Sequence, residues 1–286
     1  MNKKISIFFV AGFFILLSGM GEAFVPQTPH LLHLMIKKIK QPYGLEIHQT
    51  RNVMDVLVKI VEPGTQIEKK TVDLDEKLVY VFPDKFRSEI VSEGVSRFYM
   101  ESASQFVKVV DGKLVALKKS PVDFYTDPLL YRDYESLVRQ LGLAGVNTDR
   151  VSFRRFDNKI CYLIGKPPLN QTESSGLWIE KTSLFPIRYV IIKNGWTVAF
   201  HYDNWQEVSK TWYPMLTTIY VDGQLFAMID VRQIELVSQV SQALFDVTGI
   251  HSRYPVPDSL REGEPGSSGK IDELDQQIEI FKKLYE

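Results

Sequence analysis

Cysteine is nearly absent from this sequence, which has 286 residues and a single cysteine, Cys161. One cysteine excludes an intrachain disulfide, so a packed core has to hold the fold. A strong charge of one sign is lacking as well, because 34 Lys and Arg residues stand against 35 Asp and Glu residues. This balance gives no global electrostatic case for nucleic acid or an anionic membrane surface as a partner.

Recognisable catalytic motifs are also missing. The sequence has no G-x-S-x-G, no H-E-x-x-H, no P-loop and no dinucleotide-binding fingerprint. His30 and His33 are three residues apart but have no Cys or acidic residue near them, which favours ordinary surface or core histidines over a metal site. Cys161 lies in the strand-like segment KICYLI, which favours a small buried hydrophobe over a nucleophile. We therefore predict a protein that is not an enzyme, with no metal and no cofactor.

The N-terminus has the pattern of a secretory signal peptide. Two early lysines precede the uncharged apolar run 5–17, and Gly21 and Ala23 offer small residues at the −3 and −1 positions of a cleavage site. The run is short for a membrane-spanning helix, which needs about 20 residues, although a retained N-terminal anchor stays as the alternative. Met20 stands where a lipid-bearing Cys would be. We predict a signal peptide at residues 1–23, export to the periplasm, and a soluble mature chain without a lipid anchor.

Strand patterns dominate from about residue 45 to residue 237. Two-residue turns flanked by β-branched and aromatic residues recur at Asp111-Gly112, Asp157-Asn158, Asn194-Gly195 and Asp222-Gly223. Such pairs favour tight hairpins because both central residues of a type I′ turn need positive φ. Pro63-Gly64 is a looser fifth candidate. The repeated hairpins predict an antiparallel meander in which neighbouring strands pair in chain order.

Two helices are expected beside the sheet. For the first, Thr28 is the predicted N-cap, Pro29 fits the first helical position, and Pro42 ends the run. For the second, Asp127 is the predicted N-cap and Gly142 the residue after the C-terminus. Since the second helix lies between hairpins, it is expected to cross one face or the mouth of the sheet.

Acidic residues gather around this second helix, namely Asp123, Asp127, Asp133 and Glu135. A carboxylate pair for acid–base chemistry is one interpretation of such a group. Negative charge near a helix start is also favourable by itself, because it complements the helix dipole. The second interpretation is preferred, so these residues are expected to be solvated.

The C-terminal part has a different character. Residues 251–270 are rich in Pro, Gly, Ser and charge, which is typical of a linker. In residues 271–286 apolar positions recur at spacings of three and four, which predicts an amphipathic helix. Two heptads alone are marginal in water. A frayed tail and a helix docked on the body or on a partner therefore both remain open.

Aromatic residues make up 12% of the chain and stud the predicted strands. A sheet with this much apolar surface either packs tightly or curls into a half-barrel that leaves an apolar cavity for a guest. Composition leaves both outcomes open.

Three segments carry a family resemblance: VYVFPDKFRSEI at 79–90, QFVKVVDGKLVAL at 105–117 and LWIEKTSLFPIRYVI at 177–191. They are similar to segments of the LolA-like and LolB-like lipoprotein carriers, and the likeness spans about residues 28–247. The resemblance implies a mainly β (α+β) fold, an unclosed antiparallel β-barrel, or half-barrel, with helices as plug or lid. We accordingly place a LolA-like lipid-binding domain at residues 24–250.

The resemblance also implies a function and a site. Its members shield acyl chains of lipoproteins, or lipids, during transfer toward the outer membrane, and the implied partners are lipoprotein-transfer proteins of the inner or outer membrane. An alternative is a periplasmic sensor or interaction module of the same fold. In the carriers an arginine before a proline latches the lid; here Phe82 stands there, and Arg87 is the nearest arginine. The implied cavity and lid residues are Leu31, Leu34, Met35, Val79, Val81, Phe86, Phe106, Leu130, Tyr134, Leu137, Trp178 and Phe200.

Overall fold

The computed structural model describes residues 25–40, 42–54, 71–92, 95–103, 105–167, 173–193, 195–257 and 260. The predicted signal peptide at 1–23, the Pro63-Gly64 turn and the amphipathic helix at 271–286 lie outside the described residues. In the part of the chain that is described, no helix is long and apolar enough to span a membrane.

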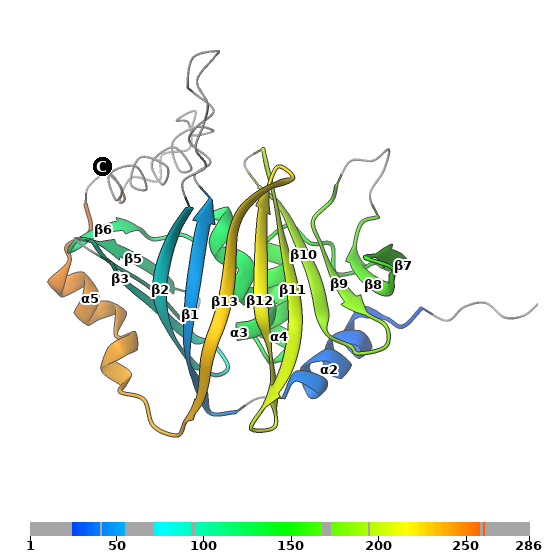
Figure 1. Cartoon of the computed structure of the whole chain (residues 1–286), viewed down its shortest axis with the longest axis horizontal. Coiled ribbons are helices and arrows are strands. Elements are labelled where there is room, and N and C mark those ends of the chain that lie inside the picture. Colours follow the sequence, from blue (N-terminus) through cyan, green and yellow to red (C-terminus); the bar gives the residue numbers. More distant parts are fainter. Residues whose placement is uncertain are drawn as a thin grey trace, which may run out of the picture.

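A single antiparallel sheet of thirteen strands dominates the described structure (Figure 1). The strands are β1 Gly44–Met54, β2 Thr71–Val81, β3 Lys85–Ser92, β4 Val95–Ser102, β5 Gln105–Val110, β6 Lys113–Ala116, β7 Val151–Phe156, β8 Lys159–Gly165, β9 Gly176–Glu180, β10 Pro186–Lys193, β11 Trp196–Val208, β12 Thr211–Val221 and β13 Gln224–Val237. Their order is β6-β5-β4-β3-β2-β1-β13-β12-β11-β10-β9-β8-β7. Because β6 and β7 are the two edges, the sheet is not closed, and the predicted mainly β, half-open fold is confirmed.

The strand order corrects one prediction. Strands pair in chain order within β1–β6 and within β7–β13, as the hairpins predicted. These two meanders are joined in the middle of the sheet by β1 and β13, whose registered pairs run from Gly44 with Val237 to Val53 with Ala227. A simple meander from first to last strand is therefore wrong. The pairing of β1 with β13 depends on residues far apart in sequence, which no local turn signal can reveal.

Three of the predicted tight turns are present among the described residues. Asp111-Gly112, Asp157-Asn158 and Asp222-Gly223 all have positive φ at both residues and join β5 to β6, β7 to β8 and β12 to β13. Lys193 of β10 pairs with Trp196 of β11, on either side of the fourth predicted turn, whose first residue lies outside the described residues. Ser209-Lys210, which joins β11 to β12, has φ values of 48° and 73° and contains neither Gly nor Asn. Because this turn lacks the Gly and Asn residues that favour positive φ, the sequence does not predict it.

The helical segments are α2 Thr28–Ile39, the 3₁₀ turn η2 Pro121–Thr126, α3 Asp127–Leu130, α4 Tyr134–Leu143, η3 Gln242–Phe245 and α5 Val247–Arg253. Three expectations about their ends are wrong, those for Thr28, Asp127 and Gly142. Thr28 lies inside α2, whose N-cap is Gln27. The second predicted helix is divided into η2, α3 and α4, and Asp133 caps α4 by accepting a hydrogen bond from Ser136 N at 2.8 Å. Gly142 lies within α4, and Gly145, with φ of 81°, follows its end.

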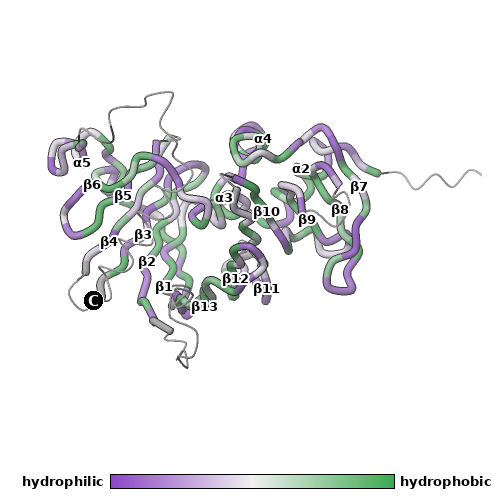
Figure 2. Tube along the Cα trace, turned by 90° about the horizontal axis from the view of Figure 1, so that it is seen from above, coloured by the Kyte–Doolittle hydropathy of each residue, from purple (hydrophilic) through white to green (hydrophobic). Residues whose placement is uncertain are grey.

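The sheet is curved, and its two faces differ. Figure 2 shows the strands following a curve from β6 to β7 with α3 and α4 on its inner side. We call the face that carries Leu78 and Tyr80 of β2 the inner face, and the face that carries Val79 and Val81 the outer face, since successive side chains of a strand point to opposite sides. The segment from η2 to α4 connects the edge strands β6 and β7 and crosses the inner face, as predicted for the second helix.

Each face has its own buried apolar cluster. The large first cluster joins inner-face residues to α2, η2, α3 and α4, and includes Leu32, Tyr80, Leu129 and Tyr202. A second cluster on the outer face of β2, β4, β5 and β6 is covered by Phe245 of η3 and Ile250 of α5. A third cluster, around Cys161, Leu163 and Trp178, lies on strands β8 to β11. In the described structure, the inner face and the outer face of β2 to β6 are thus covered by short segments rather than by a second sheet.

Candidate functional site

The inner face beneath α2, η2, α3 and α4 is the candidate site. On the strands, Phe86 and Phe200 are fully buried there, and Leu31 of α2 and Leu137 of α4 meet them in the first cluster. The helices present apolar side chains at helical spacing and the strands present them at every second position, so both contribute one continuous apolar surface. The structure therefore describes a continuous apolar inner face that these helical segments cover.

The structure brings seven of the predicted site residues together in the first cluster: Leu31, Met35, Phe86, Phe106, Leu130, Leu137 and Phe200. Tyr134 packs against this cluster and is partly exposed. Val79 and Val81 belong to the second cluster and Trp178 to the third, while Leu34 is half-buried and belongs to none of the three. A two-residue period identifies two faces of a strand but does not say which face turns inward.

Arg87, the candidate latch, lies with the second cluster on the outer face. Its Nε donates to Glu89 Oε1 at 2.6 Å, its Nη1 donates to the carbonyl oxygen of Leu244 at 3.2 Å, and its guanidinium lies 4.2 Å from the centre of the Phe98 ring. These contacts hold η3 on the sheet.

Arg132, which sequence reasoning missed, holds the inner segments together. It follows α3, is 2% exposed, and donates to the carbonyl oxygens of Leu129, Lys40 and Trp212 and to Thr211 Oγ1. Its guanidinium also lies 4.5 Å from the centre of the Phe82 ring. Burial lowers the pKa of Arg132 to about 10. One side chain thus connects the end of α2, the α3–α4 junction and β12.

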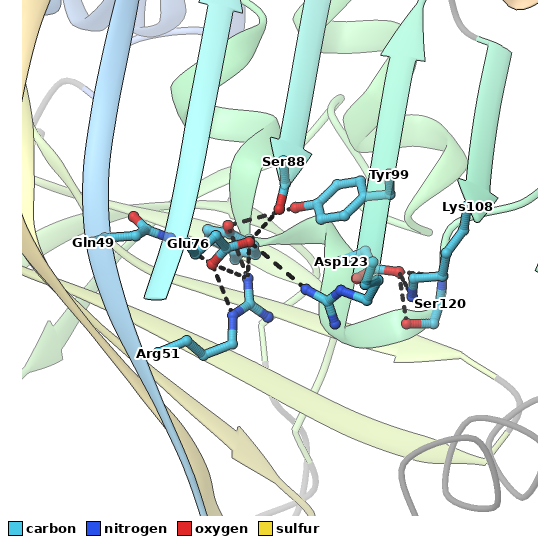
Figure 3. A network of polar contacts seen from close by, with 10 residues as sticks. Gln49, Arg51, Glu76, Ser88, Tyr99, Lys108, Ser120 and Asp123 are labelled. Carbon is cyan, nitrogen blue, oxygen red and sulfur yellow. Dashed lines mark hydrogen bonds and ion pairs between the residues drawn. The ribbon is translucent and has the colours of Figure 1, made fainter. Parts of the chain in front are cut away.

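A network of buried ionic groups interrupts the apolar inner face at β1 to β5 (Figure 3). Glu76 of β2 is at its centre and accepts hydrogen bonds from Gln49 Nε2 at 2.8 Å, from Arg51 Nε at 3.0 Å and Nη2 at 3.1 Å, and from Ser88 Oγ. Arg97 Nη2 lies 3.7 Å from Glu76 Oε1. The Glu76 side chain is 0% exposed and that of Arg51 is 5% exposed, so the pair is shielded from water.

The neighbouring charges keep these groups ionised. Burial alone would raise the pKa of Glu76, but Arg51, Arg97 and the hydrogen bonds from Ser88 and Gln49 hold it below its usual value. Burial opposes the charge of Arg51 as well, and the Glu76 carboxylate more than offsets this, so the pKa of Arg51 is raised. The charged forms of Arg51 and Glu76 are therefore stable in this buried position only because each neutralises the other.

A second ionic contact joins η2 to β5. Asp123 Oδ2 accepts hydrogen bonds from Lys108 Nζ at 3.0 Å, from Ser120 Oγ at 2.9 Å and from Ser120 N at 3.2 Å. Burial raises the pKa of Asp123, but Lys108 and Arg97 outweigh it and the pKa is lowered. For Lys108, burial is the largest influence and its pKa is lowered.

A third contact places Lys119 between two carboxylates, with Nζ 2.5 Å from Glu101 Oε2 and 2.6 Å from Asp127 Oδ1. Tyr131 donates its hydroxyl hydrogen to Glu101 as well. The expectation of solvated acids is therefore wrong for Asp123 and Asp127, which are 2% and 0% exposed. Cationic partners from β5 and from the segment before η2 make their burial tolerable, and the positions of those partners cannot be derived from the local sequence.

A weak signal for this network does exist in the sequence. Glu76 occurs at the same two-residue parity as Leu74, Leu78 and Tyr80, so the inner face that buries these residues must also bury the carboxylate. Among the described residues, no three His, Cys, Asp or Glu side chains converge in an arrangement that could hold a metal ion. Cys161 is buried, and burial raises the pKa of its thiol.

Comparison with solved structures identifies the class of fold. The domain assigned to outer membrane lipoprotein sorting from Vibrio parahaemolyticus matches 78% of this chain and 97% of its own, with 8% identity and a TM-score of 0.50. A LolA superfamily protein from Nitrosomonas europaea matches 79% of this chain and 100% of its own, with 7% identity and a TM-score of 0.50. A DUF1329 family protein from Desulfovibrio piger matches 78% and 97%, with 12% identity and a TM-score of 0.47.

No protein-family model matches the sequence, and no curated protein matches it. The likeness is therefore one of structure: the chain has a LolA-like fold, an unclosed antiparallel sheet with helices on its inner face. The resemblance drawn from the three sequence segments is confirmed at the level of the fold.

Proposed function

We propose that this chain is a non-enzymatic carrier or chaperone of the periplasm that shields lipoprotein acyl chains, or lipids, on the inner face of its sheet. The observation that carries the proposal is that, in the described part of the chain, this apolar face is covered by short helical segments and not by a second sheet. Short segments can be displaced without breaking a strand pair, so the apolar face can exchange its own cover for a guest.

The energetics of such an exchange are favourable for an acyl chain. Each methylene group removed from water contributes about 0.8 kcal/mol, so a long chain can replace the contacts of one displaced helix. The segment α2 is suited to displacement because it contacts mainly β12 and α4. In the proposal, Leu31 and Met35 leave the sheet with α2, and the strand residues Phe86 and Phe200 contact the cargo.

Native mass spectrometry of protein purified gently from the periplasm, with lipid extraction of the same sample, tests the proposal. The expected result is lipid or acylated peptide at close to one per chain. Delipidated protein that takes up no lipid, and a purified sample that contains none, would contradict it.

Tryptophan fluorescence reports whether α2 moves during uptake. Lys38 of α2 lies 4.8 Å from the centre of the Trp212 ring, and Phe185 stacks against Trp205 at 4.6 Å nearby. If α2 leaves the inner face, Trp212 loses its cation and its emission changes on addition of an acyl chain. The Trp212→Phe variant is the control, because it should bind the acyl chain equally well and lose most of the signal.

The path of the C-terminal segment favours a second candidate, a sensor or interaction module of the same fold. Phe245, Ile250 and Leu260 pack on the outer face, away from the proposed cargo site, so the last described residue lies on that side. Deleting residues 271–286 separates the candidates. A periplasmic pull-down that loses a membrane partner on deletion supports the sensor, and unchanged partners with unchanged lipid uptake support the carrier.

A further inference from the structure

The buried ionic network on the inner face is more than an acyl chain requires. Methylene groups need only an apolar surface, and buried charges oppose their binding by holding water or demanding partners. The network nevertheless lies within the face proposed for cargo, because Val53, Leu74 and Ile90 flank it on one side and Ile47, Leu78 and Phe86 on the other.

Around Glu76 and Asp123 the charges do not balance. Arg51, Arg97 and Lys108 supply three positive charges there, whereas Glu76 and Asp123 supply two negative ones; the separate contact of Lys119 with Glu101 and Asp127 has the opposite excess. Both carboxylates already have their own donors: Glu76 accepts from Gln49, Arg51 and Ser88, and Asp123 accepts from Lys108 and Ser120. A buried surplus charge is unfavourable unless a further counter-charge is available.

Arg97 is the cation of this group that has no carboxylate within hydrogen-bonding distance among the described residues. Its Nε and Nη2 are buried and have no hydrogen-bond acceptor among the described residues, since Glu76 Oε1 is 3.7 Å away. The Arg97 side chain is 14% exposed, whereas that of Glu76 is 0% exposed. Arg97 therefore lies where the network borders solvent. Arginine offers a planar fork of donors that matches the oxygens of carboxylate and phosphate groups.

Lys108 is positioned to share the same anion. Arg97 pairs with Val110 across β4 and β5, and Tyr99 pairs with Lys108, so Arg97 and Lys108 are diagonal neighbours on one face of two adjacent strands. Both lie against the ring of Tyr99, with the Arg97 guanidinium at 5.9 Å and Lys108 Nζ at 6.0 Å from its centre. Tyr99 itself belongs to the first apolar cluster. A cationic pair and an apolar surface therefore meet at this ring.

We infer that Arg97 and Lys108 bind the anionic head group, carboxylate or phosphate, of the cargo, and that the cargo is consequently an acidic lipid rather than a neutral acylated peptide. The acyl chain extends from this pair along Tyr99 and Phe106 under the inner helices. This inference rests on the proposed function, because it assigns the cargo class of the same face.

Two probes that differ only in the head group test the inference, a fluorescent fatty acid and the primary alcohol with the same chain. Titration of the delipidated full mature protein at low ionic strength measures both affinities. We expect the acid to bind about tenfold more tightly than the alcohol, as befits a charge-assisted contact. The Arg97→Gln variant should lose this preference while its affinity for the alcohol is unchanged.

Arg87→Gln is the matched control, because Arg87 is also a partly buried strand arginine but lies on the outer face. It should keep the preference for the acid. Arg97→Lys supplies a second reading if Arg97→Gln does not fold: it keeps the charge without the fork, so the preference should shrink without vanishing.

Each result has a defined meaning. Equal binding of acid and alcohol by the wild-type protein overturns the head-group assignment and leaves the carrier proposal intact, whereas binding of neither probe overturns both. Inorganic phosphate distinguishes a lipid head group from a free anion. If phosphate alone raises the melting temperature of the wild type but not of Arg97→Gln, and the acid has no advantage, the site belongs to a free anion and the lipid assignment is wrong.

Discussion

Arg51 and Glu76 form a two-point ion pair across the first two strands, with Nε to Oε2 at 3.0 Å and Nη2 to Oε1 at 3.1 Å. Neither side chain has appreciable contact with water. Arg51 also donates to the Tyr125 hydroxyl at 3.1 Å, so the pair extends from the sheet to η2. It connects the strands to the segment that covers them.

Breaking this pair is expected to be costly. Glu76→Gln leaves the Arg51 charge buried without its counter-ion and should lower the free energy of unfolding by about 3–5 kcal/mol. Replacing both partners by apolar residues, Arg51→Met with Glu76→Leu, should cost less than the sum of the single changes. Urea denaturation followed by circular dichroism measures this. Disruption of the exposed pair Arg232–Asp75 is the control, expected within about 0.5 kcal/mol; additive losses at the buried pair would contradict the argument.

Arg132→Lys should loosen α2. Lysine keeps a positive charge but loses the planar fork whose two terminal nitrogens donate to the oxygens of Lys40, Thr211 and Trp212. We expect faster amide hydrogen exchange in residues 31–39, with β11 to β13 nearly unchanged. Arg139→Lys on the exposed side of α4 is the control. Exchange that rises uniformly over the sheet would instead indicate a global loss of stability.

Asp127 should make stability depend on pH. Its burial, with a contribution from Glu101, raises its pKa to about 6 despite Lys119. A raised pKa means that the folded state holds the proton more tightly, so this contribution is complete below pH 3.8, the ordinary value, and is lost as the pH rises through about 6. From pH 7 to pH 5 the wild type should gain about 1–2 kcal/mol relative to Asp127→Asn. A constant difference between the two proteins across that range would rule out this assignment.

The segment that follows β13 should be needed to cover the outer face. Phe245 and Ile250 pack against Val79, Met100 and Val107. A chain that ends at residue 239 should expose this cluster, bind a hydrophobic dye several-fold more strongly and tend to aggregate. A chain that ends at residue 260 keeps the cover and serves as the control. Equal dye binding by the two chains would show that the cover contributes little.

Local signals in the sequence foretold much of the fold. The Asp-Gly and Asp-Asn turns predicted the positions of hairpins, because positive φ at two successive positions depends on the preferences of those two residues alone. Proline and apolar spacing located α2 for a similar reason. The Ser209-Lys210 turn was not predicted, because the strands on either side impose positive φ on two residues that do not favour it.

The candidate site was foretold only in part. Leu31, Phe86 and Phe200 lie in one cluster on the inner face, whereas Val79 and Trp178 belong to other clusters. Alternation along a strand places successive side chains on opposite faces, but it does not indicate which face the helices cover.

The order of residues along the chain was sufficient for the strand-rich composition, the tight turns and the first helix, because these depend on φ preferences and on spacings within a few residues. Contacts between distant segments produce the pairing of β1 with β13 and the hydrogen bonds of Arg132. They also produce the burial of Glu76 beside Arg51 and Arg97. A charged side chain becomes a core residue only when another part of the chain brings its counter-charge, and that meeting exists only in the folded protein.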